Sequence, residues 1–206
     1  MILPAAQALQ RLREGNNRFA ANESAHRVGA EARRRELTEG QEPFAIILGC
    51  SDSRVPAEII FDQGLGDLFV IRVAGNIVEP SQIGSIEFAA SKFGTRLVVV
   101  LGHSRCGAIE ETMRELQEPA EGRSNNIRAI VDFIRPSLEA LLEQEPGDDP
   151  DAIVGKAVRA NVRASAERLR HGSEIIENME RDDGLLIVGA EYSLETGLVD
   201  FFDGAP

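Results

Sequence analysis

The two cysteines of this 206-residue chain stand in similar settings, each shortly after an apolar run that ends in Leu-Gly. Cys50 lies in ILGCSDSRVP, and Cys106 in VLGHSRCGAI, where His103 directly follows the glycine. Two thiolates and one imidazole suit zinc in tetrahedral geometry, and three protein ligands leave the fourth position open, as in catalytic zinc sites. The pattern therefore predicts that Cys50, His103 and Cys106 hold one catalytic zinc ion.

Two other interpretations of these residues compete with the metal site. Both cysteines would serve equally well as small buried hydrophobic residues, with His103 a hydrogen-bonded core histidine. A redox dithiol is a weaker alternative, because Cys50 and Cys106 do not form a C-x-x-C motif. The metal site is favoured because the two similar apolar runs place a thiol and an imidazole at equivalent strand ends.

Asp52 and Arg54 follow Cys50 at alternate positions. In a short extended segment, side chains two residues apart point to the same side, where a guanidinium can clamp a carboxylate. Spacing alone would favour an ordinary surface ion pair, which contributes little to stability. Because Asp52 lies two residues from the predicted metal ligand Cys50, we instead expect the pair to interact with the groups that bind to the metal.

Four apolar runs predict buried strands: FAIILG at 44–49, LFVIRVAG at 68–75, RLVVVLG at 96–102 and LLIVGA at 185–190. Helical segments separate them, which is typical of parallel strands joined by crossover helices. The fold class is therefore α/β, with a mainly parallel central sheet flanked by helices. Because functional groups gather beyond the carboxyl ends of such strands, Cys50 and His103 are expected at the same edge of the sheet.

The segments between and around these strands complete the predicted fold. They are an amphipathic helix within the first twenty residues, a helix at 81–93 capped by Ser81, a helix at 125–144 kinked or interrupted at Pro136, a helix at 151–179 separated from it by EPGDDP, and a turn at Thr196-Gly197 into a last strand at the sheet edge.

Composition indicates an ordinary globular protein, and the length fits one domain, 1–206, better than two. We divide it into an N-terminal helical arm, 1–40, and an α/β core, 41–206. The formal charge of -12 disfavours partnership with nucleic acid or anionic lipid. Without a recognisable secretion signal or a long apolar stretch, the chain is expected in the cytoplasm, and paired thiols in that reducing compartment favour metal chemistry.

Taken together, these motifs resemble the β-class carbonic anhydrases. The matching segments are CSDSRVPAEIIFDQGLGDLFVIRVAGN, GSIEFA, VVVLGHSRCGAI and VGAEYSLETGLV, which cover the core from about Gln41 to Val199. The combination of C-x-D-x-R with H-x-x-C is far more specific than either motif alone. The resemblance implies reversible hydration of CO2 to bicarbonate and a proton, with Zn2+ as cofactor and self-association as a dimer or tetramer.

The resemblance also assigns roles to individual residues. Cys50, His103 and Cys106 match the family's zinc ligands, and Asp52 with Arg54 its catalytic dyad. The residues that match the small substrate pocket, which lies partly across a dimer interface, are Gln41, Phe69, Ala74, Phe88 and Gly107. Two alternatives stay open: a hydrolase of CS2 or COS on the same scaffold, and a non-catalytic interaction module stabilised by zinc.

Overall fold

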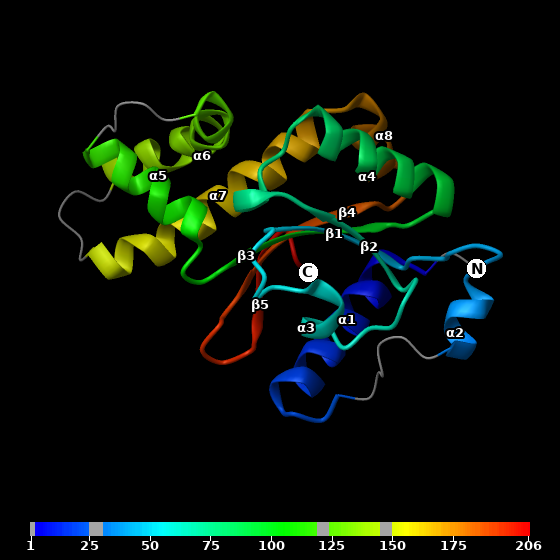
Figure 1. Ribbon diagram of the computed structural model, residues 1–206. Coiled ribbons are helices and arrows are strands. Elements are labelled where there is room, and N and C mark those ends of the chain that lie inside the picture. Colours follow the sequence, from blue (N-terminus) through cyan, green and yellow to red (C-terminus); the bar gives the residue numbers. More distant parts are fainter. Residues whose placement is uncertain (1–2, 25–30, 119–123, 145–149) are drawn as a thin grey trace.

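The computed structural model describes residues 3–24, 31–118, 124–144 and 150–206, and within these ranges five strands form one sheet (Figure 1). The sheet order is β2-β1-β3-β4-β5, in which the first four strands are parallel and β5 is antiparallel to β4. This confirms the predicted α/β class. The strands are β1 (Ala45–Gly49), β2 (Leu68–Arg72), β3 (Leu97–His103), β4 (Leu186–Tyr192) and β5 (Val199–Asp203).

Helices cover both faces of the sheet: α1 and α3 lie on one side, and α4, α7 and α8 on the other, while α5 and α6 extend beyond one end (Figure 1). None of the helices in the described ranges is long and apolar enough to cross a bilayer. The helices are α1 (Ala5–Ala20), α2 (Glu31–Glu36), α3 (Ala57–Ile60), α4 (Pro80–Phe93), α5 (Gly107–Gln117), α6 (Asn125–Gln144), α7 (Pro150–His171) and α8 (Glu174–Asp182), with a 3-10 turn, η1, at Ala74–Asn76.

Strand β1 shows why the strand sequences are apolar without alternation. Its side chains alternate between two cores: Ile47 packs against the cluster under α1 and α3, whereas Ile46 and Leu48 pack against the cluster under α4 and α7. Every residue of β1 is buried. A strand covered on both faces must be apolar at every position, which is the pattern seen in the sequence.

The N-terminal helix packs closely against the core, as its predicted apolar face requires. Leu9 and Leu12 of α1 are buried against the face of the sheet that this helix covers. At Gly15 a Cβ atom would lie 1.9 Å from the carbonyl oxygen of Phe61, so only glycine permits this approach between α1 and α3. The next residue, Asn16, is buried and hydrogen-bonds to other elements.

Two predicted helix boundaries are wrong. Helix α4 is not capped by Ser81: its N-cap is Glu79, whose N–H donates to Gln82 Oε1 over 3.2 Å, and Pro80 occupies the first turn, where a missing N–H has no cost. The helix expected to run to residue 179 ends at His171. Ser173 then caps the separate helix α8, accepting from the Ile176 N–H, because a side-chain cap competes successfully with continued helix.

The other predicted helices and strands are present, but the strand expected at 68–75 ends at Arg72, and the 3-10 turn η1 occupies 74–76. Helix α6 has the predicted bounds and runs through Pro136, and the segment 196–197 turns the chain into the antiparallel edge strand β5. The EPGDDP segment expected to separate α6 from α7 lies largely outside the described residues, which omit 145–149.

Candidate metal centre

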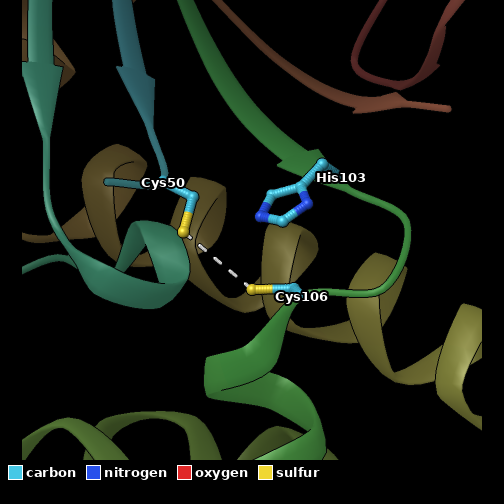
Figure 2. A group of neighbouring side chains, drawn as sticks. All are labelled: Cys50, His103 and Cys106. Atoms are coloured by element: carbon cyan, nitrogen blue, oxygen red, sulfur yellow. Dashed lines mark hydrogen bonds between the residues drawn. The ribbon is translucent and has the colours of Figure 1, made fainter. Parts of the chain in front are cut away.

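Cys50 and His103 lie side by side because they stand at the carboxyl ends of adjacent parallel strands (Figure 2). Cys50 comes directly after β1, and His103 is the last residue of β3. The chain passes from β1 outward to β2 and then returns to β3 on the opposite side of β1. Their carboxyl ends therefore form a topological switch point, where open parallel sheets bind ligands. Cys106 completes the group as the N-cap residue of α5.

The three side chains converge as zinc ligands would. Their ligand atoms all lie within 4.8 Å of one another, and the two Sγ atoms are 4.0 Å apart. Tetrahedral zinc with Zn–S bonds of about 2.3 Å places two sulfurs about 3.8 Å apart. Both cysteines are free, and this separation is far longer than a disulfide bond.

The imidazole of His103 is oriented for a metal by its neighbour. Its Nδ1 lies 2.9 Å from the Ser104 carbonyl oxygen, so Nδ1 carries the proton and Nε2 holds the free lone pair. Nε2 is buried without a hydrogen-bond partner among the described residues. A buried polar atom in this position needs an explanation, and a metal provides one.

The two thiols share a polar environment that favours a thiolate at Cys50. The contact with Cys106 is the largest cause of a pKa of Cys50 below its usual range, and the same contact is the largest cause of the raised pKa of Cys106. The Gly75 N–H also donates to Cys50 Sγ over 3.4 Å. A zinc ion would replace the shared proton and take both sulfurs as thiolates.

Asp52 and Arg54 form a bidentate pair beside these ligands. Arg54 Nε donates to Asp52 Oδ1 over 2.9 Å and Nη2 donates to Oδ2 over 2.7 Å. The guanidinium holds the pKa of Asp52 well below its usual range, so the carboxylate is ionised at neutral pH. Asp52 Oδ2 lies 3.9 Å from His103 Nε2, which places this acceptor next to the atom that would bind the metal.

Two of the predicted pocket residues lie close to this centre. Ala74 directly precedes Gly75, the residue that donates to Cys50. Gly107 directly follows Cys106 as the first residue of α5, and the space around its Cα is open. Its N–H is one of the helix N-terminal donors that have no partner within the helix, which makes it available to a negatively charged oxygen.

The other three predicted pocket residues lie elsewhere within this chain. Gln41 precedes β1 and lines a cavity of about 570 Å³ that includes Phe93. The strand β1, which is roughly 16 Å long, lies between Gln41 at one end and Cys50 at the other. Phe69 and Phe88 form a ring cluster with Phe93, with centroids 5.7 to 6.3 Å apart. A second copy of the chain would be needed to bring these residues to a metal centre.

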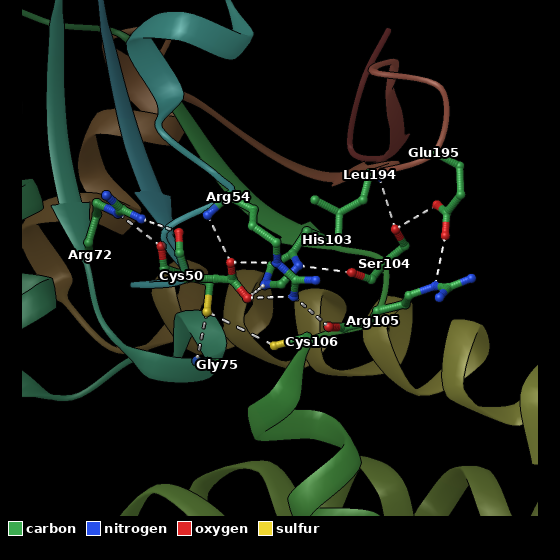
Figure 3. Close-up of polar contacts among 11 residues, drawn as sticks. Cys50, Arg54, Arg72, Gly75, His103, Ser104, Arg105, Cys106, Leu194 and Glu195 are labelled. Carbon is green, nitrogen blue, oxygen red and sulfur yellow. Dashed lines mark hydrogen bonds and ion pairs between the residues drawn. The ribbon is translucent and has the colours of Figure 1, made fainter.

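The sequence interpretation did not assign a function to Arg105 or Glu195. Arg105 has a positive φ of 53°, and its carbonyl accepts from Arg54 Nη2 over 3.1 Å. Glu195, in the turn between β4 and β5, accepts from Arg105 Nε over 2.9 Å (Figure 3). No local pattern links positions 90 residues apart, so only the resemblance of the SLETG segment to a family motif marked this turn as notable.

Comparison with known proteins agrees with the geometry of the centre. A family model described as carbonic anhydrase matches residues 45–199. The chain is 39% identical to a carbonic anhydrase of Mycolicibacterium smegmatis, over 94% of this chain and 91% of the relative. This chain belongs to the β-class carbonic anhydrases. Carbonic anhydrase 2 of Mycobacterium tuberculosis is 37% identical, over 92% of this chain and 89% of the relative.

Solved structures show the same β-carbonic anhydrase fold. The enzyme CafA of Aspergillus fumigatus superposes with a TM-score of 0.76 at 23% identity, covering 97% of this chain and 91% of that one. A tetrameric β-carbonic anhydrase of Sordaria macrospora gives 0.74 at 23% identity, covering 95% and 97%. At this identity the similarity concerns the fold alone. It agrees with the strand order and the flanking helices of this carbonic anhydrase.

Proposed function

We propose that this β-carbonic anhydrase hydrates CO2 reversibly to bicarbonate and a proton, using zinc held by Cys50, His103 and Cys106. The observation that carries the proposal is the placement of the Asp52–Arg54 pair beside three converging ligand atoms. Family membership makes CO2 the expected substrate. Zinc, when bound, would make a nucleophile available near neutral pH by lowering the pKa of a water molecule. The known example is the three-histidine carbonic anhydrases, in which that pKa is about 7.

The chain's own residues then orient the reaction. Asp52, kept ionised by Arg54, would accept a hydrogen bond from the nucleophile and so turn its free lone pair toward the substrate carbon. The Gly107 N–H is placed to donate to an oxygen of CO2 as that oxygen gains negative charge. The reaction releases one proton per turnover, which passes to water and buffer.

We further propose that the active form is a homodimer or tetramer in the cytoplasm. Phe88 is 54% exposed, and its cluster with Phe69 and Phe93 forms an apolar surface that a second copy would cover. In such an assembly Phe69, Phe88 and Gln41 would line the substrate pocket together with Ala74. The Sordaria macrospora relative is described as tetrameric. The Sγ atoms of the two free cysteines are only 4.0 Å apart, and thiols this close stay reduced in a reducing compartment such as the cytoplasm.

The proposed function is tested by metal analysis and a CO2-hydration assay on the same preparation. We expect about one zinc per chain and hydration that disappears with chelation and returns with zinc. Turnover of CS2 or COS is measured in parallel. Zinc without hydration would reduce the protein to a zinc-stabilised interaction module, and faster turnover of CS2 or COS than of CO2 would make it a hydrolase of sulfur analogues.

A further inference from the structure

Glu195 joins the turn after β4 to the segment that connects two metal ligands (Figure 3). One of its carboxylate oxygens accepts from Ser104 Oγ over 3.0 Å, and the other accepts from Arg105 Nε over 2.9 Å. Ser104 and Arg105 are the two residues that follow His103 and precede Cys106. A single carboxylate therefore holds both consecutive side chains of the connecting segment.

The backbone of this segment fixes the orientation of two functional side chains. The Ser104 carbonyl holds His103 Nδ1, and the Arg105 carbonyl holds Arg54 Nη2. Nη2 is also the atom that donates to Asp52 Oδ2. The dyad arginine is thus fixed between the Asp52 carboxylate and a backbone oxygen whose direction depends on Arg105.

Arg105 adopts a backbone conformation that needs support. Its φ of 53° lies in the left-handed region, which is unfavourable for a residue with a Cβ atom. Its side chain is 72% exposed, so burial does not hold it in place. The Arg105 side chain donates to Glu195, and this contact holds Arg105 against the β4–β5 turn.

The turn that carries Glu195 is itself well anchored. Ser193 N–H donates to the Leu198 carbonyl over 2.9 Å, and Leu194 N–H donates to Ser104 Oγ over 3.0 Å. From α1, Asn16 donates to the Gly197 carbonyl over 2.8 Å. Glu195 therefore extends from a fixed base, so its carboxylate can set the position of its partners.

We propose that Glu195 is a positioning residue of the active centre, which keeps the Ser104–Arg105 segment in the conformation that orients Arg54 and His103. It contacts Ser104 and Arg105, which lie between the proposed metal ligands, rather than the ligands themselves. Its loss would leave Arg54 paired with Asp52 but free to swing with it, so the Asp52 acceptor would point less accurately toward the open ligand position. The kinetic consequence rests on the proposed function, whereas the effect on Arg54 does not.

Glu195→Gln is the variant that tests this inference, because an amide cannot accept from both partners while keeping the ion pair with Arg105. Glu111→Gln is the control, since Glu111 also forms a solvent-accessible ion pair with an arginine, Arg114 on α5, with both of its carboxylate oxygens engaged. We expect kcat/KM for CO2 to fall on the order of fivefold in Glu195→Gln, less than direct loss of a group beside the metal, with zinc content and Tm close to the parent. Glu111→Gln should match the parent in all three.

A double-mutant cycle separates positioning from general weakening of the fold. If Glu195 acts through Arg54, Glu195→Gln should have little further effect on kcat/KM in an Arg54→Lys background. Equal fold-losses in both backgrounds would overturn the inference, as would unchanged kcat/KM in the single variant.

A readout that needs no catalysis keeps the inference separate from the proposed function. Solvent exchange of the Arg54 Nη2 protons, one of which the Arg105 carbonyl accepts, should be several-fold faster in Glu195→Gln than in the parent, with the signal assigned in the NMR spectrum by its disappearance in Arg54→Lys. The same exchange rate in both would refute positioning even if the parent hydrates CO2. A parent that holds zinc but lacks hydration would refute the proposed function alone.

Discussion

At the scale of single residues, each functional side chain depends on a backbone group nearby. The Ser104 carbonyl selects the His103 tautomer, the Gly75 N–H donates to Cys50, and the Arg105 carbonyl restrains Arg54. These partners are backbone atoms of other residues, so a substitution at Cys50, His103 or Arg54 itself does not remove them. Substitutions at the functional residues therefore test the chemistry with limited disturbance of the geometry.

Replacing Cys106 by serine should remove most of the bound zinc. The substitution takes away one of three ligands, and a hydroxyl is a much poorer zinc ligand than a thiolate. Metal analysis after dialysis should show well under one zinc per chain, and calorimetry should show a lower Tm because the metal also stabilises the fold. Full zinc occupancy in this variant would contradict the ligand assignment.

Asp52→Asn should separate zinc binding from catalysis. The amide keeps the shape of the side chain but loses the charge that pairs with Arg54, and it presents a donor where an acceptor is needed. We expect zinc content near that of the parent and CO2 hydration lower by roughly ten- to a hundredfold.

The control for this variant is Asp132→Asn, which alters a surface carboxylate near Arg135 on α6. It should change neither zinc content nor hydration. Unchanged hydration in Asp52→Asn would leave Asp52 an ordinary ion-pair residue, and a structural role for the zinc would then fit better.

At the scale of elements, the N-terminal helix α1 is hydrogen-bonded to the end of α3 and to the turn between β4 and β5. Its Asn16 side chain donates to the carbonyls of Ile60 and Gly197 over 3.1 Å and 2.8 Å, and accepts from the Val199 N–H over 2.8 Å. One buried amide thus joins α1, α3 and the β4–β5 turn. We retain as a prediction the division into an arm, 1–40, and a core, 41–206.

Asn16→Ala should lower the free energy of unfolding by about 2–4 kcal/mol, because it leaves buried backbone groups without partners. Urea denaturation measures the change. Gln10→Ala, which removes an exposed pair with Glu14 on the same helix, is the control and should change the free energy by under about 0.5 kcal/mol. Similar values for the two variants would show that α1 is not held by Asn16.

At the scale of the whole molecule, burial of Tyr192 couples folding to alkaline pH. Burial raises the pKa of this tyrosine above its usual value of about 10. The folded protein therefore keeps a proton that the unfolded chain releases. The associated stability is fully present below about pH 10 and is lost as pH rises toward the folded-state pKa.

Tyr192 is the only tyrosine in a chain without tryptophan, so tyrosinate absorbance reports its ionisation directly. We expect the absorbance to titrate at higher pH in the folded protein than in denaturant. Stability should also fall less steeply above pH 10 in Tyr192→Phe than in the parent. Coincident titrations of the folded and denatured protein would contradict the effect of burial.

The sequence by itself predicted the fold class, and it singled out the Cys50, His103 and Cys106 group and the Asp52–Arg54 pair, which the structure brings together. Strand ends fix where Cys50 and His103 lie, because parallel strands carry their carboxyl ends to one edge, and short spacings fix Cys106, Asp52 and Arg54 relative to them. Apolar runs revealed the strands because both faces of the sheet are covered. Each motif is local in the chain, so residue order and type are sufficient to predict it, whereas the pairing of β1 with β3 that joins the two motifs is seen in the structure.

Only the tertiary structure decided which distant groups hold the centre in place. Glu195 reaches Arg105 across 90 positions, and Asn16 reaches Gly197 across 181, through turns and side-chain lengths that no periodicity encodes. The break between α7 and α8 likewise depends on a serine cap competing with a continuous helix. Such contacts depend on how elements pack in three dimensions, and a linear pattern carries no measure of that packing.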